Sequence, residues 1–259
     1  MADSGAVPRS DLGIVVNYFT NFGAEETHRL VLEMTALNLR FLKRSEAVGT
    51  VLLVDGSPRS DTEMKERCDE LGVLYHHEGE KISYVRSYNL GWQALSEPYV
   101  GLMANDIIPH PADTIDRLLG WIRKPDVGCS FPYMSSNRLA NDETQRPGLL
   151  RGWQTCEPAT MTLNLNLFKR EVLEEIGGLD ENYLFGYGEP ILLIRIRSLG
   201  YRAVMVGNTR VFHYDELTKA VGESTLTMDL HEKDTERWYR EYGPYASHKG
   251  LAHLLSLIH

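Results

Sequence analysis

Three apolar runs of this 259-residue chain end on polar side chains that could bind a metal ion or a nucleotide. Asn17 ends "IVVN", Asp55 ends "VLLVD" and Asp106 ends "VGLMAND". Ligands of open parallel sheets bind beyond the carboxyl ends of the strands, so these positions are the first candidates for a site. A carboxylate there could coordinate Mg²⁺ or Mn²⁺, or accept hydrogen bonds from a base or ribose. The competing interpretation is a simple turn, because Asp-Gly-Ser and similar sequences also reverse the chain.

Other positions also carry suitable chemistry. Arg86 and Asn89 lie three residues apart in a helical pattern, so they share a face that could approach phosphate oxygens. Glu189 opens an apolar helical stretch, where a carboxylate could act as a general base. His213 follows the apolar run "TRVF" and could bind a metal ion. The structural alternatives are a solvated helix face for Arg86, helix-dipole stabilisation for Glu189 and a structural histidine at 213.

Strands and helices must alternate along the chain to position these residues. Short apolar runs predict strands, and apolar residues at three- and four-residue spacing predict helices. The expected strands are 12–18, 49–57, 73–79, 99–106, 127–134, 160–168, 202–208 and 209–214, and the expected helices are 24–44, 60–72, 82–96, 111–123, 169–178, 189–200, 226–242 and 250–258. This order is typical of an α/β fold with a mixed, mostly parallel sheet flanked by helices.

Bulk composition narrows the class of partner. The chain has 27 Lys and Arg against 36 Asp and Glu, a formal net charge of −9, which disfavours nucleic acid and anionic membranes. No apolar run is long enough to span a bilayer, and the first residues lack the pattern of a signal peptide. The three cysteines match no zinc motif and predict no disulfide framework. We expect reduced cysteines, a cytoplasmic protein and no transmembrane segment.

Five segments in a fixed order, followed by "TRVFHY", resemble a known family. They are "IVVNYFTN", "VLLVDGSPRSDT", "YHHEGEKISYVRSYNLGWQAL", "YVGLMANDIIPHP" and "IGGLDENYLFGYGEPILLIRIRSLGY". Together they are similar to nucleotide-sugar glycosyltransferases of the family 2 type. The resemblance covers about residues 12–215 and implies a single GT-A domain with a Rossmann-like sheet. We expect a lead over 1–11, a domain over 12–225 with a nucleotide-binding half (12–110) and an acceptor half (111–225), and a helical extension over 226–259.

The resemblance also implies a donor, a metal ion and residue roles. The donor is a nucleoside-diphosphate sugar, the metal is Mn²⁺ or Mg²⁺, and the sugar moves to an acceptor hydroxyl with inversion. The residues implied to contact the nucleotide are Asn17, Tyr18, Asp55, Arg86, Asn89 and Asn105. Asp106 and His213 are implied to bind the metal, Glu189 to act as catalytic base, and Asp180 to border the sugars at the catalytic centre. The aromatic residues expected near the acceptor are Trp153, Tyr183, Phe185 and Tyr187, whereas Arg195 and Arg197 are expected at the surface.

Two departures from the family pattern keep a second function open. Ala104 stands where the metal-binding Asp-x-Asp motif has its first acid, and Gly188 stands where an acidic pair has its first member. A catalytically degenerate domain that binds a sugar or a protein is therefore the alternative. A nucleotidyltransferase would need a Gly-rich basic loop after the first strand, which "NYFTNFGAEETHR" is not. The acceptor, whether glycan, lipid-linked sugar, natural product, protein or modified base, and the oligomeric state are not specified by the sequence.

Overall fold

The structure is a computed structural model that describes residues 10–20, 22, 24–79, 83–136, 155–157, 161–214 and 225–258. The strands are β1 (Leu12–Tyr18), β2 (Val48–Asp55), β3 (Leu74–His77), β4 (Tyr99–Met103), β5 (Ile107–His110), β6 (Val127–Ser136), β7 (Leu165–Lys169) and β8 (Arg202–His213). The helices are α1 (Glu25–Arg44), α2 (Thr62–Leu71), α3 (Tyr84–Ala94), α4 (Thr114–Ile122), α6 (Arg170–Ile176), α7 (Gly188–Ser198), α9 (Thr225–Tyr242) and α10 (His248–Leu257). A 3₁₀ turn, η3 (Gly243–Tyr245), joins the last two helices.

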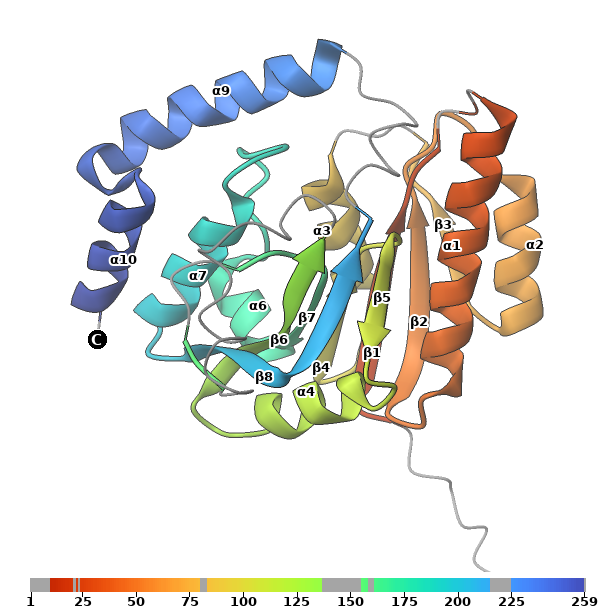
Figure 1. The fold of residues 1–259 in the computed structure, drawn as a ribbon, viewed down its shortest axis with the longest axis horizontal. Coiled ribbons are helices and arrows are strands. Elements are labelled where there is room, and N and C mark those ends of the chain that lie inside the picture. The colour runs from red at the N-terminus through yellow and green to blue at the C-terminus, as the bar shows by residue number, and fades with distance from the viewer. Residues whose placement is uncertain are drawn as a thin grey trace, which may run out of the picture.

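The strands form one mixed sheet in the order β3-β2-β1-β4-β7-β6-β8-β5 (Figure 1). Four neighbouring pairs are parallel, and β7 and β5 form the antiparallel pairs. Because β7 is antiparallel to both β4 and β6, strands β6 and β8 run in the same direction as β1, β2 and β4. The carboxyl ends of these five strands therefore meet at one edge of the sheet, which is the edge where the candidate residues were expected.

A short turn forces the sheet to curl. Only residues 104–106 separate β4, in the middle of the sheet, from β5, which pairs with β8 at its end. The sequence pattern predicted one continuous strand over 99–106, but the strand ends at Met103 and the chain turns before entering β5. A connection of three residues spans only about 10 Å. The far end of the sheet must therefore curl back toward β4.

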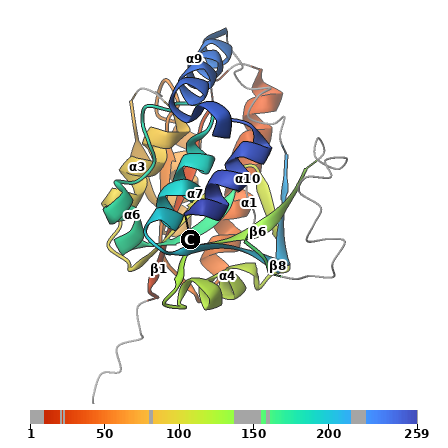
Figure 2. The ribbon, with the colours of Figure 1, turned by 90° about the vertical axis from the view of Figure 1, so that its left-hand side faces the viewer.

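Two hydrophobic cores, one on each face of the sheet, hold the layers together. Helices α1, α2 and α4 pack on one face through residues such as Leu39, Met64 and Leu118. Helices α3, α6, α7, α9 and α10 contribute to the core of the other face, and Figure 2 shows α7, α9 and α10 together on that side. The C-terminal helices thus belong to the core through Trp238 and Leu251. None of the helices in the described part of the chain is long and apolar enough to cross a membrane.

Local signals explain where several helices start and end. In α2, Asp61 caps the first turn by accepting a hydrogen bond from the Met64 N–H, and Gly72 ends the helix at a φ of 62°. Helix α6 ends similarly at Gly177, with a φ of 75°. These ends were predicted from the sequence. The strand predicted over 160–168 begins only at Leu165, and the two short strands predicted over 202–214 form the single strand β8.

Candidate functional site

Asp106 and His213, predicted to share a metal ion, lie side by side at the carboxyl edge of the sheet. The antiparallel register of β5 and β8 pairs Ile107 with His213, which brings the preceding residue, Asp106, against the imidazole. The Asp106 Oδ1 and His213 Nε2 atoms are 3.1 Å apart, and the Tyr214 N–H donates to the Asp106 carbonyl at 2.9 Å. Both side chains are largely buried. Residues more than a hundred positions apart therefore form one cluster.

This pair suits a divalent ion on geometric and chemical grounds. Two ligand atoms that bind one ion at about 2.1 Å each, at a right angle, are separated by about 3.0 Å. Carboxylate oxygen suits Mg²⁺ and Mn²⁺, and an imidazole nitrogen is a common ligand of transition metals. Within the described ranges no group of three or more His, Cys, Asp or Glu side chains could hold a metal. A bound ion would therefore take its remaining ligands from a substrate and from water.

The turn before Asp106 is fastened to helix α1. The Asn105 side-chain amide donates to the Thr35 hydroxyl at 3.1 Å, and the Asn38 amide donates to the Asn105 carbonyl at 2.8 Å. Asn105 is 4% exposed. That amide is directed into the α1 face, and the predicted contact of Asn105 with the nucleotide stays a prediction. The role of Asn105 is to hold the turn that presents Asp106.

At the end of β1, two adjacent residues point to opposite faces of the sheet, as strand geometry requires. The Tyr18 side chain lies in the core beneath α1 and α2, and its hydroxyl donates to Asp61 at 2.6 Å. The ring is only 2% exposed, so the predicted contact of Tyr18 with a base would have to come from its backbone. Asn17 shares the opposite, α3-facing side with Val15. Among the described residues, no hydrogen-bond partner satisfies the buried Oδ1 atom of Asn17.

Asp55 lies at the end of β2 as predicted, but its carboxylate is occupied. It accepts hydrogen bonds from the N–H groups of Ser57 at 2.8 Å and Asp61 at 3.2 Å, and from the Tyr75 hydroxyl. The side chain is fully buried. These contacts tie the turn after β2 to the start of α2 and to β3. The carboxylate therefore shapes the loop, and its predicted direct contact with a base stays a prediction.

Helix α3 carries the two residues predicted to face a diphosphate, and they differ. Arg86 is partly exposed, and its Nε atom lies 3.6 Å from the carboxylate of Glu78 just beyond β3. Asn89 is buried, and its amide is fully used: it donates to the Leu179 carbonyl and to Glu181, and accepts from the Leu179 N–H and from the Trp92 indole. The assignment of Asn89 as a nucleotide contact stays a prediction, and these bonds leave no free donor on its amide. Asn89 positions the loop after α6.

Asp180, predicted at the catalytic centre, is held in an ion pair. Its Oδ2 atom lies 2.6 Å from Arg195 Nη2, while Oδ1 accepts from the backbone and side chain of Asn182. Burial alone would raise the pKa of Asp180, but the Asn182 hydrogen bonds and the charges of Arg195 and Arg237 bring it below its ordinary value. A carboxylate of lowered pKa is a weak base, so a role for Asp180 in proton transfer is not supported.

The two arginines of α7 were both expected at the surface, which holds for Arg195 but not for Arg197. Arg195 is partly exposed, but it is the ion-pair partner of Asp180. Arg197 is only 6% exposed, and burial lowers its pKa while the negative charge of Glu157 opposes that change. Sequence spacing showed that the two face different directions, but it did not show which neighbours they meet.

Glu189 opens helix α7 from within the protein. Its Oε2 atom accepts a hydrogen bond from the Tyr84 hydroxyl at 3.5 Å. Burial raises the pKa of Glu189 above its ordinary value, although hydrogen bonds from its own N–H, from Tyr84 and from the Leu163 N–H partly offset this. The dry surroundings thus outweigh the helix dipole, which favours the charged form. A carboxylate of raised pKa is better suited to accept a proton near neutral pH.

Tyr84 and Tyr88 of α3 lie near Glu189 and Asp106, and the sequence did not identify them. Their rings meet edge to face at 6.2 Å, and the Tyr88 hydroxyl donates to the Leu163 carbonyl at 3.4 Å. Burial, followed by the negative charges of Asp106 and Glu189, raises the pKa of Tyr88 well above its ordinary value. Tyr88 therefore stays protonated between the two carboxylates. Their four-residue spacing on α3 is the signal that could have paired them.

The predicted acceptor aromatics separate into different environments. Tyr183 is fully buried and donates to Glu241 of α9, so its predicted place in an acceptor site is wrong. Phe185 is 37% exposed and Tyr187 is partly buried. Both rings lie near His231 of α9, at 5.9 and 6.2 Å between ring centres. Trp153 lies outside the described residues.

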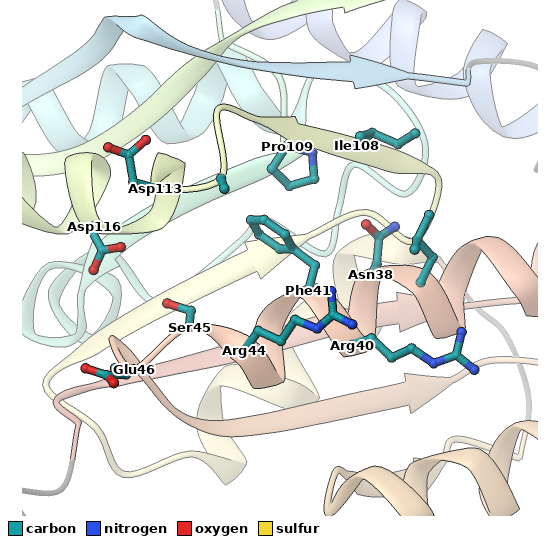
Figure 3. Close-up of a pocket in the computed structure, with 12 residues that line it drawn as sticks. Asn38, Arg40, Phe41, Arg44, Ser45, Glu46, Ile108, Pro109, Asp113 and Asp116 are labelled. Atoms are coloured by element: carbon teal, nitrogen blue, oxygen red, sulfur yellow. The ribbon is translucent and has the colours of Figure 1, made fainter.

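A separate pocket of about 670 Å³ lies between α1 and β5 (Figure 3). Phe41, Ile108 and Pro109 contribute apolar surface, and the labelled Arg40 and Arg44 come from α1. None of the predicted site residues lines this pocket. It therefore lies apart from the cluster of Asp106 and His213.

Comparison with known proteins places the fold. At the level of sequence, no protein-family model and no curated protein matches the chain. Solved structures do match. One is GalNAc-T7 with UDP, GalNAc and Mn²⁺, at a TM-score of 0.61 and 17% identity, over 93% of this chain and 50% of that one. Another is the mannosyltransferase PcManGT from Pyrobaculum calidifontis in complex with GDP-Man and Mn²⁺, at a TM-score of 0.58 and 18% identity, over 97% and 75%.

A third similar structure is S. aureus TarS, at a TM-score of 0.58 and 10% identity, over 90% of this chain and 43% of that one. The chain thus spans about half the length of the first of these proteins. Identities this low support a shared fold and leave the family 2 assignment a prediction. The chain has the predicted single-domain α/β architecture of the GT-A type, the fold of nucleotide-sugar glycosyltransferases.

Proposed function

We propose that this chain transfers a sugar from a nucleoside-diphosphate sugar to an acceptor hydroxyl with the help of Mn²⁺ or Mg²⁺. The observation that carries the proposal is the pairing of Asp106 with His213 at 3.1 Å, at the carboxyl edge of a GT-A sheet. The solved GalNAc-T7 and mannosyltransferase structures hold a nucleotide or nucleotide sugar together with Mn²⁺. The donor sugar and the acceptor remain unspecified.

Residues near this pair can receive the nucleotide. The register places Tyr18 opposite Asp55 and Val16 opposite Met103, so Asn17 lies at the level where β4 turns toward Asp106. The unsatisfied Asn17 Oδ1 atom can accept a hydrogen bond from a base or ribose, and the partly exposed Arg86 can contact a diphosphate. When bound by Asp106 and His213, a divalent ion would neutralise the charge that develops on the leaving diphosphate.

Glu189 is the proposed general base. An acceptor hydroxyl must lose its proton as it attacks the sugar, and the raised pKa of this buried carboxylate suits that task. Attack from the face opposite the leaving group would invert the anomeric carbon in a single displacement. Phe185 lies in the loop before α7, and its exposed ring is available to contact an acceptor sugar.

The test is metal-dependent release of nucleoside diphosphate from a panel of UDP- and GDP-sugars. We expect nucleoside diphosphate to be released with Mn²⁺ and the release to stop when the metal is chelated. Release by the Asp106→Asn variant should no longer respond to added Mn²⁺. Glu189→Gln should retain nucleotide binding by calorimetry while transfer falls by about 10² to 10⁴. Glu171→Gln is the matched control, because Glu171 occupies the first turn of α6 but is exposed. Fully active Glu189→Gln would exclude this residue as the base.

A binding module without turnover is the alternative, because Ala104 and Gly188 replace two acids of the family pattern. Gly188 is buried, and a Cβ atom there would lie in ordinary van der Waals contact with the Tyr84 hydroxyl, 3.4 Å away. Calorimetry distinguishes the two functions. A chain that binds a UDP- or GDP-sugar with Mn²⁺ but releases no diphosphate from any donor would support the binding module, and a chain that binds no nucleotide sugar would exclude the transferase.

A further inference from the structure

The loop that leads into Glu189 is held by a carboxylate from the C-terminal helix α9. The Oδ2 atom of Asp234 accepts hydrogen bonds from the backbone N–H groups of Phe185 at 2.7 Å and Gly186 at 2.9 Å. Asp234 is only 4% exposed, which protects both bonds from competing water. Bonds from N–H groups to a charged carboxylate are shorter and stronger than neutral ones. This single side chain therefore fixes the path of the backbone two residues before α7.

The loop needs such support because its last residue has an unfavourable conformation. Tyr187, the N-cap of α7, has a φ of 64° in the left-handed region, which costs a non-glycine residue about 1 kcal/mol or more. Its ring stacks on Trp238 of α9 at 5.2 Å, with an interplanar angle of 11°. Its hydroxyl lies 3.3 Å from the Thr235 Oγ1 atom. Helix α9 thus restrains both the backbone and the side chain of the segment that aims Glu189.

We propose that Asp234 is a positioning residue for the catalytic base Glu189, so that α9 is part of the catalytic machinery. The inference rests on the proposed function. Without the carboxylate, two backbone N–H groups would lose their acceptor, and the loop would relax to recover hydrogen bonds elsewhere. The strained Tyr187 would then be free to leave the left-handed region. Because Glu189 follows it by two residues in the first turn of α7, its carboxylate would be displaced.

The charge of Asp234 also acts on the hydrogen-bond donor of Glu189. Burial, with the negative charges of Glu189 and Asp234 among the further causes, raises the pKa of Tyr84 well above its ordinary value. Tyr84 therefore remains protonated and can donate to Glu189 at 3.5 Å. Asp234 thus acts on Glu189 in two ways: through the backbone of the loop before α7 and through its charge on Tyr84 of α3.

The experiment compares Asp234→Ala with Asp234→Asn. We expect the Ala variant to lower kcat by about 10², as a displacement near 1 Å can do, with the KM for the donor changed less than about threefold. The Asn variant can still accept both N–H bonds on its Oδ1 atom, so it should keep kcat within about fivefold. Asp229→Ala, an exposed acid on the same helix, should leave kcat unchanged.

Amide hydrogen exchange supplies a readout that does not depend on activity. In the Ala variant, exchange of the peptide containing Phe185 and Gly186 should accelerate at least about tenfold, with no change in the Asn or Asp229→Ala variants. Unchanged exchange would overturn the inference whatever the kinetics. Accelerated exchange with a normal kcat would show that the loop does not position the base. An Asn variant whose kcat is as low as that of the Ala variant would also overturn the inference. A wild-type chain that turns over no donor would remove the proposed function and the role of Asp234 in it.

Discussion

Replacing Glu189 by Gln should stabilise the folded protein at neutral pH, although it removes the proposed base. Glu189 is partly buried beside Tyr84, and desolvation raises the pKa of its carboxyl. Ionising it in the folded state therefore costs more than in water. Gln has the same shape and keeps an acceptor oxygen for the Tyr84 hydroxyl, but it carries no charge. The stability gain measures the cost of the buried charge.

The sign of the pH dependence follows from proton linkage. Below the pKa of an unfolded Glu, about 4.3, both states are protonated and the charge costs nothing. Between that value and the raised pKa, the folded state holds more protons than the unfolded chain, so wild-type stability falls as pH rises. Above the raised pKa the cost is constant. The Gln variant should thus gain about 1.4 kcal/mol for each pH unit by which the pKa of Glu189 is raised.

Urea denaturation of both proteins between pH 4 and 8 measures this difference. For a chain of this size, about 1 kcal/mol corresponds to about 2 to 4 °C in Tm, so thermal melts can also resolve it. Glu171→Gln is the control: that carboxylate lies in the first turn of α6 but is exposed, so its loss should destabilise by less than about 1 kcal/mol. A gain for Glu189→Gln that does not change with pH would refute the buried-charge explanation.

Three other substitutions test the supports of the site. Asn89→Ala removes four hydrogen bonds, three of them buried, and should cost about 3 kcal/mol or more in urea denaturation. A cost below about 1 kcal/mol would contradict the assigned role. Gly91→Ala would place a Cβ atom 2.2 Å from Val15 and should cost about 1 to 3 kcal/mol in stability. Gly120→Ala is the control, because it has open space in α4 and should stabilise the protein by up to about 1 kcal/mol. Equal effects of the two substitutions would refute the close contact between α3 and β1. Asp61→Asn should destabilise the protein at neutral pH, because the hydrogen bonds to Asp61 outweigh its burial and lower its pKa. The stability difference from wild type should shrink as the pH falls below about 3.9. A stability difference independent of pH would argue against that ionised network.

The periodicity of the sequence was enough to predict most elements and the fold class. Helix α2 shows why: its apolar pattern, the capping Asp61 and the final Gly72 are all local signals. The break after Met103 was not predicted, because residues 99–106 read as one apolar strand. Only the pairing of β5 with β8 at the far end of a curled sheet requires the chain to turn at that point.

The candidate residues were recognised from strand ends and family resemblance, but their roles depend on the direction in which each side chain points. Asn17 and Tyr18 are adjacent, yet one side chain faces α3 and the other enters the core beneath α1 and α2. Asn89 has the chemistry of a ligand contact, but its amide is satisfied by the Leu179 backbone and neighbouring side chains. A sequence shows which donors and acceptors exist, whereas only packing shows which of them are already used.

What the sequence determined by itself was the set of elements and the chemical types at their ends, because both depend on local periodicity and turn chemistry. The tertiary structure decided which of those residues meet. Strand register brings His213 to Asp106 across more than a hundred positions. The packing of α9 brings the Asp234 carboxylate to the backbone of the loop before Glu189, although no sequence motif identifies Asp234. Such contacts, and the desolvation that raises the pKa of Glu189, arise from long-range packing and leave no periodic signal in the chain.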